Sequence, residues 1–144
     1  MSNENNSKQL SRSEAREQAF MLLFSNSFGD EPIEDIIEDN EDLFEGGICG
    51  YAKAVAGAVM DKAEELDAAV SKYLKKGWTV SRISKASRAI LRLAIYEIKY
   101  VDSVPDSVAV SEAVELAKKY TLNESKFVNG VLGSFIRGRS EEKV

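Results

Sequence analysis

Apolar residues recur at intervals of three and four along most of the chain, which is the spacing of amphipathic α-helices. The stretches with this pattern are residues 11–28, 51–76, 84–100, 105–120 and 122–137. A shorter acidic helix is expected from about Pro32 to Asp39. Few runs alternate apolar and polar residues as a strand would. The pattern therefore predicts an all-α fold.

Local signals mark where some of these helices begin and end. Ser11 and Glu14 have the spacing of a capping box, in which two side chains bond to each other's backbone N–H groups. Thr121 and Glu124 repeat this spacing before the last helix. Gly77 is a plausible cap after the longest run, because glycine readily adopts the left-handed conformation that ends many helices.

The sequence KFVNGVL, residues 126–132, contains Asn-Gly, which is a strong β-turn signal. The apolar residues around it nevertheless keep helical spacing, so we place Asn129 and Gly130 inside the last helix. Glycine costs about 1 kcal/mol relative to alanine in a helix interior. We therefore interpret Gly130 as a packing notch against another helix, and Asn129 as an inward-pointing polar anchor.

The composition excludes several kinds of catalytic site. The chain has no histidine, so it cannot form a Ser-His-Asp triad, a Cys–His pair or a histidine-containing zinc site. Cys49 is the only cysteine, which excludes an intramolecular disulfide and fits a reducing cytosol. No apolar stretch approaches the roughly 20 residues of a membrane span. We expect a cytoplasmic protein that is not an enzyme and has no metal or cofactor.

The net charge of −5 hides a strong segregation of charge. Residues 17–69 contain fourteen acidic and two basic side chains, whereas residues 70–101 contain eight basic side chains and one acidic one. A polyanion responds to the field within roughly 8–10 Å at physiological salt, rather than to the total charge. The basic part is therefore a candidate for binding RNA, and the acidic part for binding a basic protein.

Two basic stripes are candidates for the RNA contact. Arg12 and Arg16 lie four residues apart at the start of the first helix, and Phe20 continues their line. Arg88 and Arg92 lie with other basic residues on a helix that is otherwise apolar, so this stripe is expected to be its one exposed face. From spacing alone, each stripe also fits an ordinary solvated helix face.

Lys126 and Phe127 form a third candidate, at the start of the last helix. Backbone N–H groups and the helix dipole attract anions at such a position. Spacing alone favours Phe127 as a core residue.

Long segments of the second half, "ILRLAIYEIKYVDSVPDSVAVSEAVELAKKY" and "ESKFVNGVL", resemble the NusB family of bacterial transcription antitermination factors. The segment "AREQAFMLLFS" near the N-terminus fits the family pattern as well. The resemblance implies an all-α fold of two small helical bundles packed around long central helices. We expect these bundles at about residues 11–76 and 77–138, between a flexible arm (1–10) and a flexible tail (139–144).

The resemblance also implies a function without catalysis. NusB-family proteins pair with NusE, a small-subunit ribosomal protein, and the pair binds boxA RNA of ribosomal leader transcripts. Together with other Nus factors on RNA polymerase, they suppress premature termination. The RNA-binding positions that the resemblance carries over are Arg12, Arg16, Phe24, Arg88, Arg92, Lys126 and Phe127. Ser87 and Ser111 depart from the family, which often has an acid and an asparagine there.

Two alternatives remain open at this point. One is a helical interaction module that self-associates, as a homodimer that covers its RNA face. The other is an RNA-binding module that acts in trans with an RNA-modifying enzyme.

Overall fold

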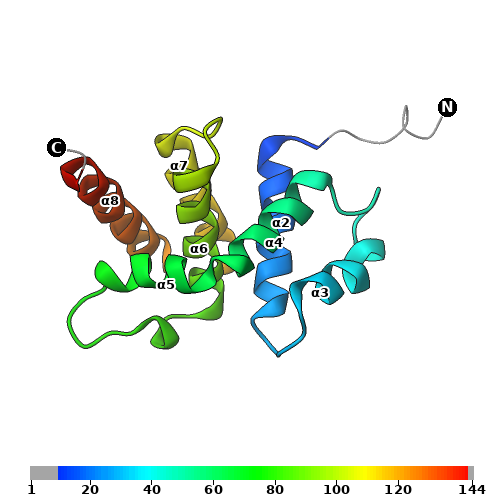
Figure 1. Cartoon of the computed structure of the whole chain (residues 1–144), viewed down its shortest axis with the longest axis horizontal. Helices are drawn as coiled ribbons and strands as arrows, with labels where there is room; N and C mark the ends of the chain where they lie inside the picture. The colour runs from blue at the N-terminus through cyan, green and yellow to red at the C-terminus, as the bar shows by residue number, and fades with distance from the viewer. Residues whose placement is uncertain (1–9, 143–144) are drawn as a thin grey trace. The chain divides into compact units, whose positions relative to one another are not determined.

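The computed structural model describes residues 10–142, with side chains as far as Ser140, and all regular elements in this range are helical. The all-α prediction is confirmed. Figure 1 shows the order of the helices along the chain, from α2 in blue to α8 in red. The chain divides into two compact units, and the division falls between Met60 and Asp61, at the end of α4. Apart from Leu10, the expected N-terminal arm lies outside the described residues.

The first unit contains α2 (Arg12–Asn26), α3 (Ile33–Asn40), the short 3₁₀ helix η1 (Glu41–Leu43) and α4 (Gly50–Asp61). The predicted capping box begins α2: Glu14 N donates to Ser11 Oγ at 3.0 Å, and Ser11 N donates to Glu14 Oε1 at 2.9 Å. The apolar faces of α2, α3 and α4 form the core of the unit. Its buried apolar residues include Ala19, Phe20, Leu23, Ile33, Ile36, Ala52, Val55 and Val59.

The second unit contains α5 (Ala63–Lys72), the 3₁₀ helix η2 (Val80–Arg82), α6 (Lys85–Tyr100), α7 (Asp106–Tyr120) and α8 (Ser125–Glu142). Helix α6 packs against α5, α7 and α8, and its Ile90, Leu91 and Ile95 are almost completely buried. The sequence predicted this central position, because apolar residues cover most of the helix circumference.

The predicted helix over residues 51–76 is interrupted at Lys62 and ends at Lys72. Gly77 has a φ of +90°, but it lies in a turn beyond the helix, so its predicted role as the cap was wrong. Because α5 packs against α6, it belongs to the second unit. The boundary between the units therefore lies earlier in the chain than the division expected at residue 76.

Helix α8 begins three residues later than expected. Thr121 Oγ1 accepts a hydrogen bond from Glu124 N at 3.2 Å, which is one half of the predicted capping box. Asn123 has a φ of +64°, which is outside the range of a right-handed helix, and residues 121–123 form a bend. Their positions place the first helical residue at Ser125.

At its other end α8 continues to Glu142, so the expected flexible tail was wrong for residues 139–142. Arg139 stabilises this last part, because its Nη1 donates to Ile98 O at 3.3 Å and its guanidinium lies 5.8 Å from the centre of the Phe135 ring. Residues 143 and 144 lie outside the described part of the chain.

Asn129 and Gly130 lie inside α8, as predicted, but their expected packing roles were wrong. Both are exposed, and a Cβ atom built on Gly130 would meet nothing within 4 Å. The notch is instead at Gly138, where a Cβ would lie 3.0 Å from Tyr73 Cζ and closer still to the Tyr73 hydroxyl. The buried face of α8 passes through Val128, Val131, Leu132 and Phe135, and the Asn-Gly pair lies off that face.

Candidate nucleic-acid interface

An open groove of about 650 Å³ lies in the second unit, between the start of α8 and the segment that connects α5 to α6. Its lining carries three basic side chains, those of Lys75, Arg82 and Lys126. It also carries three aromatic side chains, those of Tyr73, Trp78 and Phe127. Cations that neutralise phosphates and aromatic rings that stack on bases are the usual parts of a single-stranded RNA site.

Trp78 and Arg82 are in contact with each other at the groove and both line it. The Arg82 guanidinium lies over the Trp78 ring at 5.1 Å from its centre, and the ring is 48% exposed. Two hydrogen bonds shape this segment: Trp78 N donates to Lys75 O at 3.0 Å, and Arg82 Nη1 donates to Gly77 O at 3.4 Å. Sequence reasoning missed Trp78, although an aromatic residue between two basic clusters was a visible signal.

Lys126 and Phe127 lie at the first turn of α8 and both line the groove. Phe127 is 36% exposed, whereas Val128 beside it is completely buried. The inward face of α8 begins at Val128, which leaves the preceding two side chains at the surface. The structure therefore places Phe127 outside the core, in contrast to what spacing alone favoured.

Arg88 and Arg92 are instead bound to an acid of the same unit. Asp67 on α5 accepts hydrogen bonds from Arg88 Nη2 at 2.8 Å, from Arg92 Nη2 at 2.6 Å and from Arg92 Nε at 2.7 Å. The Arg92 side chain is only 14% exposed. The stripe does lie on the least buried face of α6, as expected, but Arg88 and Arg92 are paired there with Asp67 of α5.

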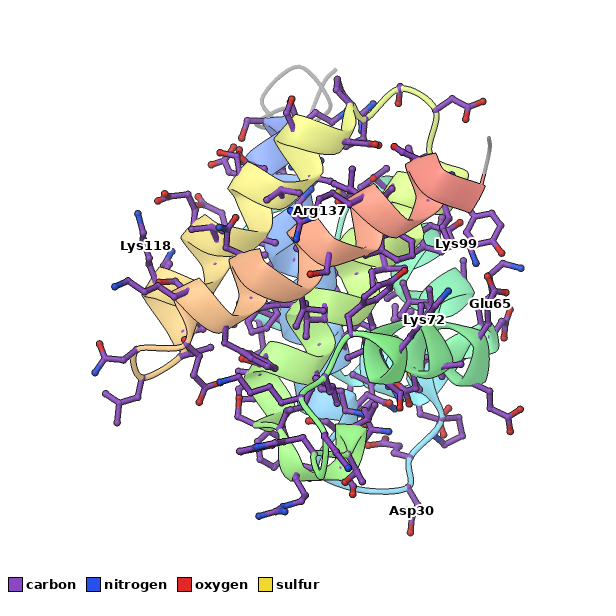
Figure 2. All side chains as sticks on the ribbon, turned by 90° about the vertical axis from the view of Figure 1, so that its left-hand side faces the viewer. Asp30, Glu65, Lys72, Lys99, Lys118 and Arg137 are labelled. Carbon is purple, nitrogen blue, oxygen red and sulfur yellow. The ribbon has the colours of Figure 1, made fainter. Side chains whose placement is uncertain are left out.

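The pKa of Asp67 reflects this arrangement. Burial acts to raise it, but the hydrogen bonds and positive charges of Arg92 and Arg88 outweigh that effect and hold the pKa below its usual value. Lys99, farther along α6, is likewise paired with Glu65 on α5, as Figure 2 shows. Acidic residues of the segment 17–69 thus neutralise basic residues of the segment 70–101 within the fold.

The candidates in the first unit differ strongly from one another. Arg12 is exposed, with its guanidinium 5.0 Å from the centre of the Tyr51 ring. Arg16, one turn later, is 3% exposed, so the expected exposed stripe does not continue to it. Phe24 is partly buried between Phe20, on which it stacks at 5.5 Å, and Phe28, whose ring edge lies 5.0 Å away.

The second unit thus brings Lys126 and Phe127 together in one groove with Trp78 and Arg82, but it uses Arg88 and Arg92 in an ion-pair cluster. The RNA-binding role of all seven sequence candidates stays a prediction. Among the described residues, no helix has both the length and the apolar character needed to cross a membrane.

The chain is similar to proteins of one family along nearly its whole length. The NusB family model matches residues 13–137. Transcription antitermination protein NusB of Lacticaseibacillus paracasei is 40% identical over 128 residues, which cover 88% of this chain and 95% of that protein. The protein of the same name from Symbiobacterium thermophilum is 41% identical over 140 residues, with 90% and 91% of the two chains covered.

Solved structures give the same result. T. maritima NusB superimposes with a TM-score of 0.77 at 32% identity, covering 90% of this chain and 93% of that one. A crystal structure of antitermination factors NusB and NusE in complex with dsRNA matches with a TM-score of 0.77 at 27% identity, covering 88% and 96% of the two chains. By sequence and by fold, this chain belongs to the NusB family.

Proposed function

We propose that this protein is an RNA-binding transcription antitermination factor that pairs with NusE and binds boxA RNA of ribosomal leader transcripts. With other Nus factors on RNA polymerase, in the cytoplasm, it suppresses premature termination. The curated relatives are named as transcription antitermination proteins, and one solved relative is in complex with NusE and dsRNA. The observation that carries the proposal for this chain is the groove lined by cations and aromatic rings.

The groove suits a single strand of RNA rather than a paired one. Stacking on an aromatic side chain requires a base that is free of its neighbours, and contributes about 1–3 kcal/mol per base. Phe127 and the Trp78–Arg82 pair offer two such surfaces, and Lys126 and Lys75 supply positive charge for the phosphates. Exposed Arg12 of the first unit is a further phosphate contact in this proposal.

The acidic surface of the first unit supports a basic protein partner. The pKa of Glu31 is raised by its hydrogen bond to Asp39, by burial, and by the negative charges of Asp39 and Asp35. Because crowded carboxylates repel one another, a basic partner would relieve this repulsion on binding. We assign that role to NusE, whose position on this chain stays a proposal.

A titration of boxA RNA tests the proposal, with and without NusE, at two salt concentrations. We expect tighter binding to boxA than to a scrambled RNA in the presence of NusE, and a steep loss of affinity with salt, because phosphate contacts release counterions. Equal affinities for the two RNAs in the presence of NusE would overturn it. Sedimentation at several protein concentrations, with and without RNA, separates the alternative of a homodimer that RNA cannot open.

A further inference from the structure

Glu124 is the one acidic side chain among the described residues that line the groove. Its neighbours there include the cations of Lys126 and Arg82. A carboxylate repels phosphate, so it weakens the general attraction of the groove for RNA. Its position therefore calls for a role other than binding the RNA backbone.

The Glu124 carboxylate is held in place by two serine hydroxyls, one from Ser84, the N-cap of α6, and one from Ser87 in its first turn. Ser84 Oγ donates to Glu124 Oε1 at 2.7 Å, and Ser87 Oγ donates to the same oxygen at 2.5 Å. Ser84 Oγ in turn accepts from Ser87 N at 3.1 Å, and Ser87 is completely buried. The carboxylate is thus oriented before any ligand binds, which lowers the entropy cost of binding.

The backbone of Glu124 is fixed as well. Its N–H donates to Thr121 Oγ1 at 3.2 Å, and its carbonyl accepts from Val128 N at 3.0 Å at the start of α8. Glu124 comes two residues before Lys126 and three before Phe127 in the sequence, so these contacts fix the start of the helix that carries both side chains.

Both serine hydrogen bonds go to Oε1, and within the described part of the chain none goes to Oε2. An ionised carboxylate can only accept hydrogen bonds, with about two acceptor sites on each oxygen. Oε1 is therefore saturated, whereas Oε2 has room for a donor from a ligand. In RNA, such donors lie on the base edges and on the ribose 2′-hydroxyls, and only those of the base edges differ from one nucleotide to another.

We propose that Glu124 recognises the exocyclic amino group of a cytosine or adenine base that stacks in the groove, through its Oε2 atom. This inference rests on the proposed function and adds a residue that selects the base. Acidic side chains accept hydrogen bonds from the N4 amino group of cytosine, and single-stranded bases expose this edge. Uracil fits less well, because carbonyl oxygens flank its N3–H and face the carboxylate. Guanine pairs best with both oxygens of a carboxylate, and Oε1 is already occupied.

Single-stranded RNAs of about ten nucleotides, composed only of cytidine or only of uridine, test this by fluorescence anisotropy. The wild-type protein is expected to prefer oligo(C). In Glu124→Gln the serine hydroxyls can still donate to the amide oxygen, while the amide NH₂ replaces an acceptor with a donor. We expect the ratio of oligo(C) to oligo(U) affinity to fall about tenfold, the change that one charged hydrogen bond produces.

Removing a negative charge raises the affinity for oligo(C) and for oligo(U) alike. The ratio of the two affinities therefore changes only if Glu124 recognises the base. Glu115→Gln is the matched control, because it removes an exposed carboxylate of α7 outside the groove, and it should leave the ratio unchanged. Ser87→Ala should lower the ratio partway, since the carboxylate keeps its charge but loses one of its two supports.

A second measurement leaves the protein untouched. Oligo(C) in which the N4 amino group carries two methyl groups has no donor for Glu124, and it should bind the wild-type protein about tenfold more weakly. An unchanged ratio in Glu124→Gln, or full affinity for the methylated RNA, would overturn the inference and leave the proposed function standing. Failure of every RNA to bind the wild-type protein with NusE present would overturn both.

Discussion

Arg92 on α6 binds Asp67 on α5 through both carboxylate oxygens, with Nε 2.7 Å from Oδ1 and Nη2 2.6 Å from Oδ2. This bidentate geometry is the most favourable one for an arginine and a carboxylate. Arg88, one turn earlier, donates to the same Oδ2 at 2.8 Å. The cluster connects α5 to α6, so two arginines that looked like RNA ligands in the sequence have structural partners.

The first prediction concerns the stability of this cluster. Asp67→Ala leaves two guanidinium groups without the carboxylate that compensates them, and it should lower the free energy of unfolding by about 2 kcal/mol. Urea denaturation followed by circular dichroism measures the change. Asp102→Ala, which removes an exposed carboxylate from the loop after α6, is the control and should stay within about 0.5 kcal/mol of the wild type.

The second prediction concerns pH. Because the pKa of Asp67 is lower in the folded state than its usual value of 3.8, the ionised carboxylate favours folding. Its contribution is complete above pH 3.8 and is lost as the pH falls through the lower pKa of the folded state. The difference in unfolding free energy between wild type and Asp67→Asn should therefore be constant near neutral pH and shrink in acid. A difference that grows on acidification would contradict this assignment.

The third prediction compares two glycines of α8. Gly130→Ala should stabilise the protein by up to about 1 kcal/mol, because alanine is the better helix former and its Cβ meets nothing within 4 Å. Gly138→Ala should destabilise it despite the same gain in propensity, since its Cβ would lie 3.0 Å from Tyr73 Cζ. Tyr73 cannot move freely, because its ring packs edge-on against Phe135 at 6.3 Å. Thermal unfolding of the two variants gives shifts of opposite sign if this is correct.

The fourth prediction tests which cations bind RNA. Lys126→Ala should reduce the slope of log affinity against log salt by about 0.7, the value for one phosphate contact with a single strand. Lys118→Ala, which removes an exposed lysine of α7 outside the groove, should leave the slope unchanged. Arg92→Gln should also leave it unchanged, although it lowers stability, because Arg92 is engaged by Asp67. If a folded Arg92→Gln protein instead shows a reduced slope of log affinity against log salt, Arg92 contacts an RNA phosphate and this prediction is wrong.

The fifth prediction concerns stacking. Phe127→Ala should weaken boxA binding by about tenfold or more, in line with the 1–3 kcal/mol that one stacked base contributes. Trp78→Ala should have a similar effect, since Trp78 is 48% exposed and lines the same groove. Neither change removes a charge, so the salt dependence of binding should stay the same while the affinity falls. Wild-type affinity in both variants would exclude the groove as the stacking site.

Much of the helical structure could be predicted from the sequence, because its signals are local. The capping box at Ser11 and the apolar periodicity of α6 each depend on residues within a few turns of one another. The start of α8 was placed too early because the Thr121–Glu124 spacing was taken as a complete capping box. The Glu124 side chain instead accepts from hydroxyls about forty residues away, which no local pattern contains.

The candidate site was harder to predict, because exposure and pairing depend on tertiary contacts. Arg12 and Arg16 are both arginines on one helix, yet only the first is exposed. Arg92 finds its partner 25 residues away in a segment of opposite charge. The groove combines the connection after α5 with the start of α8. Trp78 and Phe127 are far apart in the sequence, and only the folded chain brings both of them to the same groove.

All the walls of the groove come from two segments of the second unit, residues 73–84 and 124–134, whereas Arg12 belongs to the other unit. An RNA that bound both would be a bivalent ligand. Its second contact would form within the same complex, and so would not depend on the concentration of RNA in solution. Shortening the RNA until it reaches only the groove would then remove this avidity without altering any contact inside the groove.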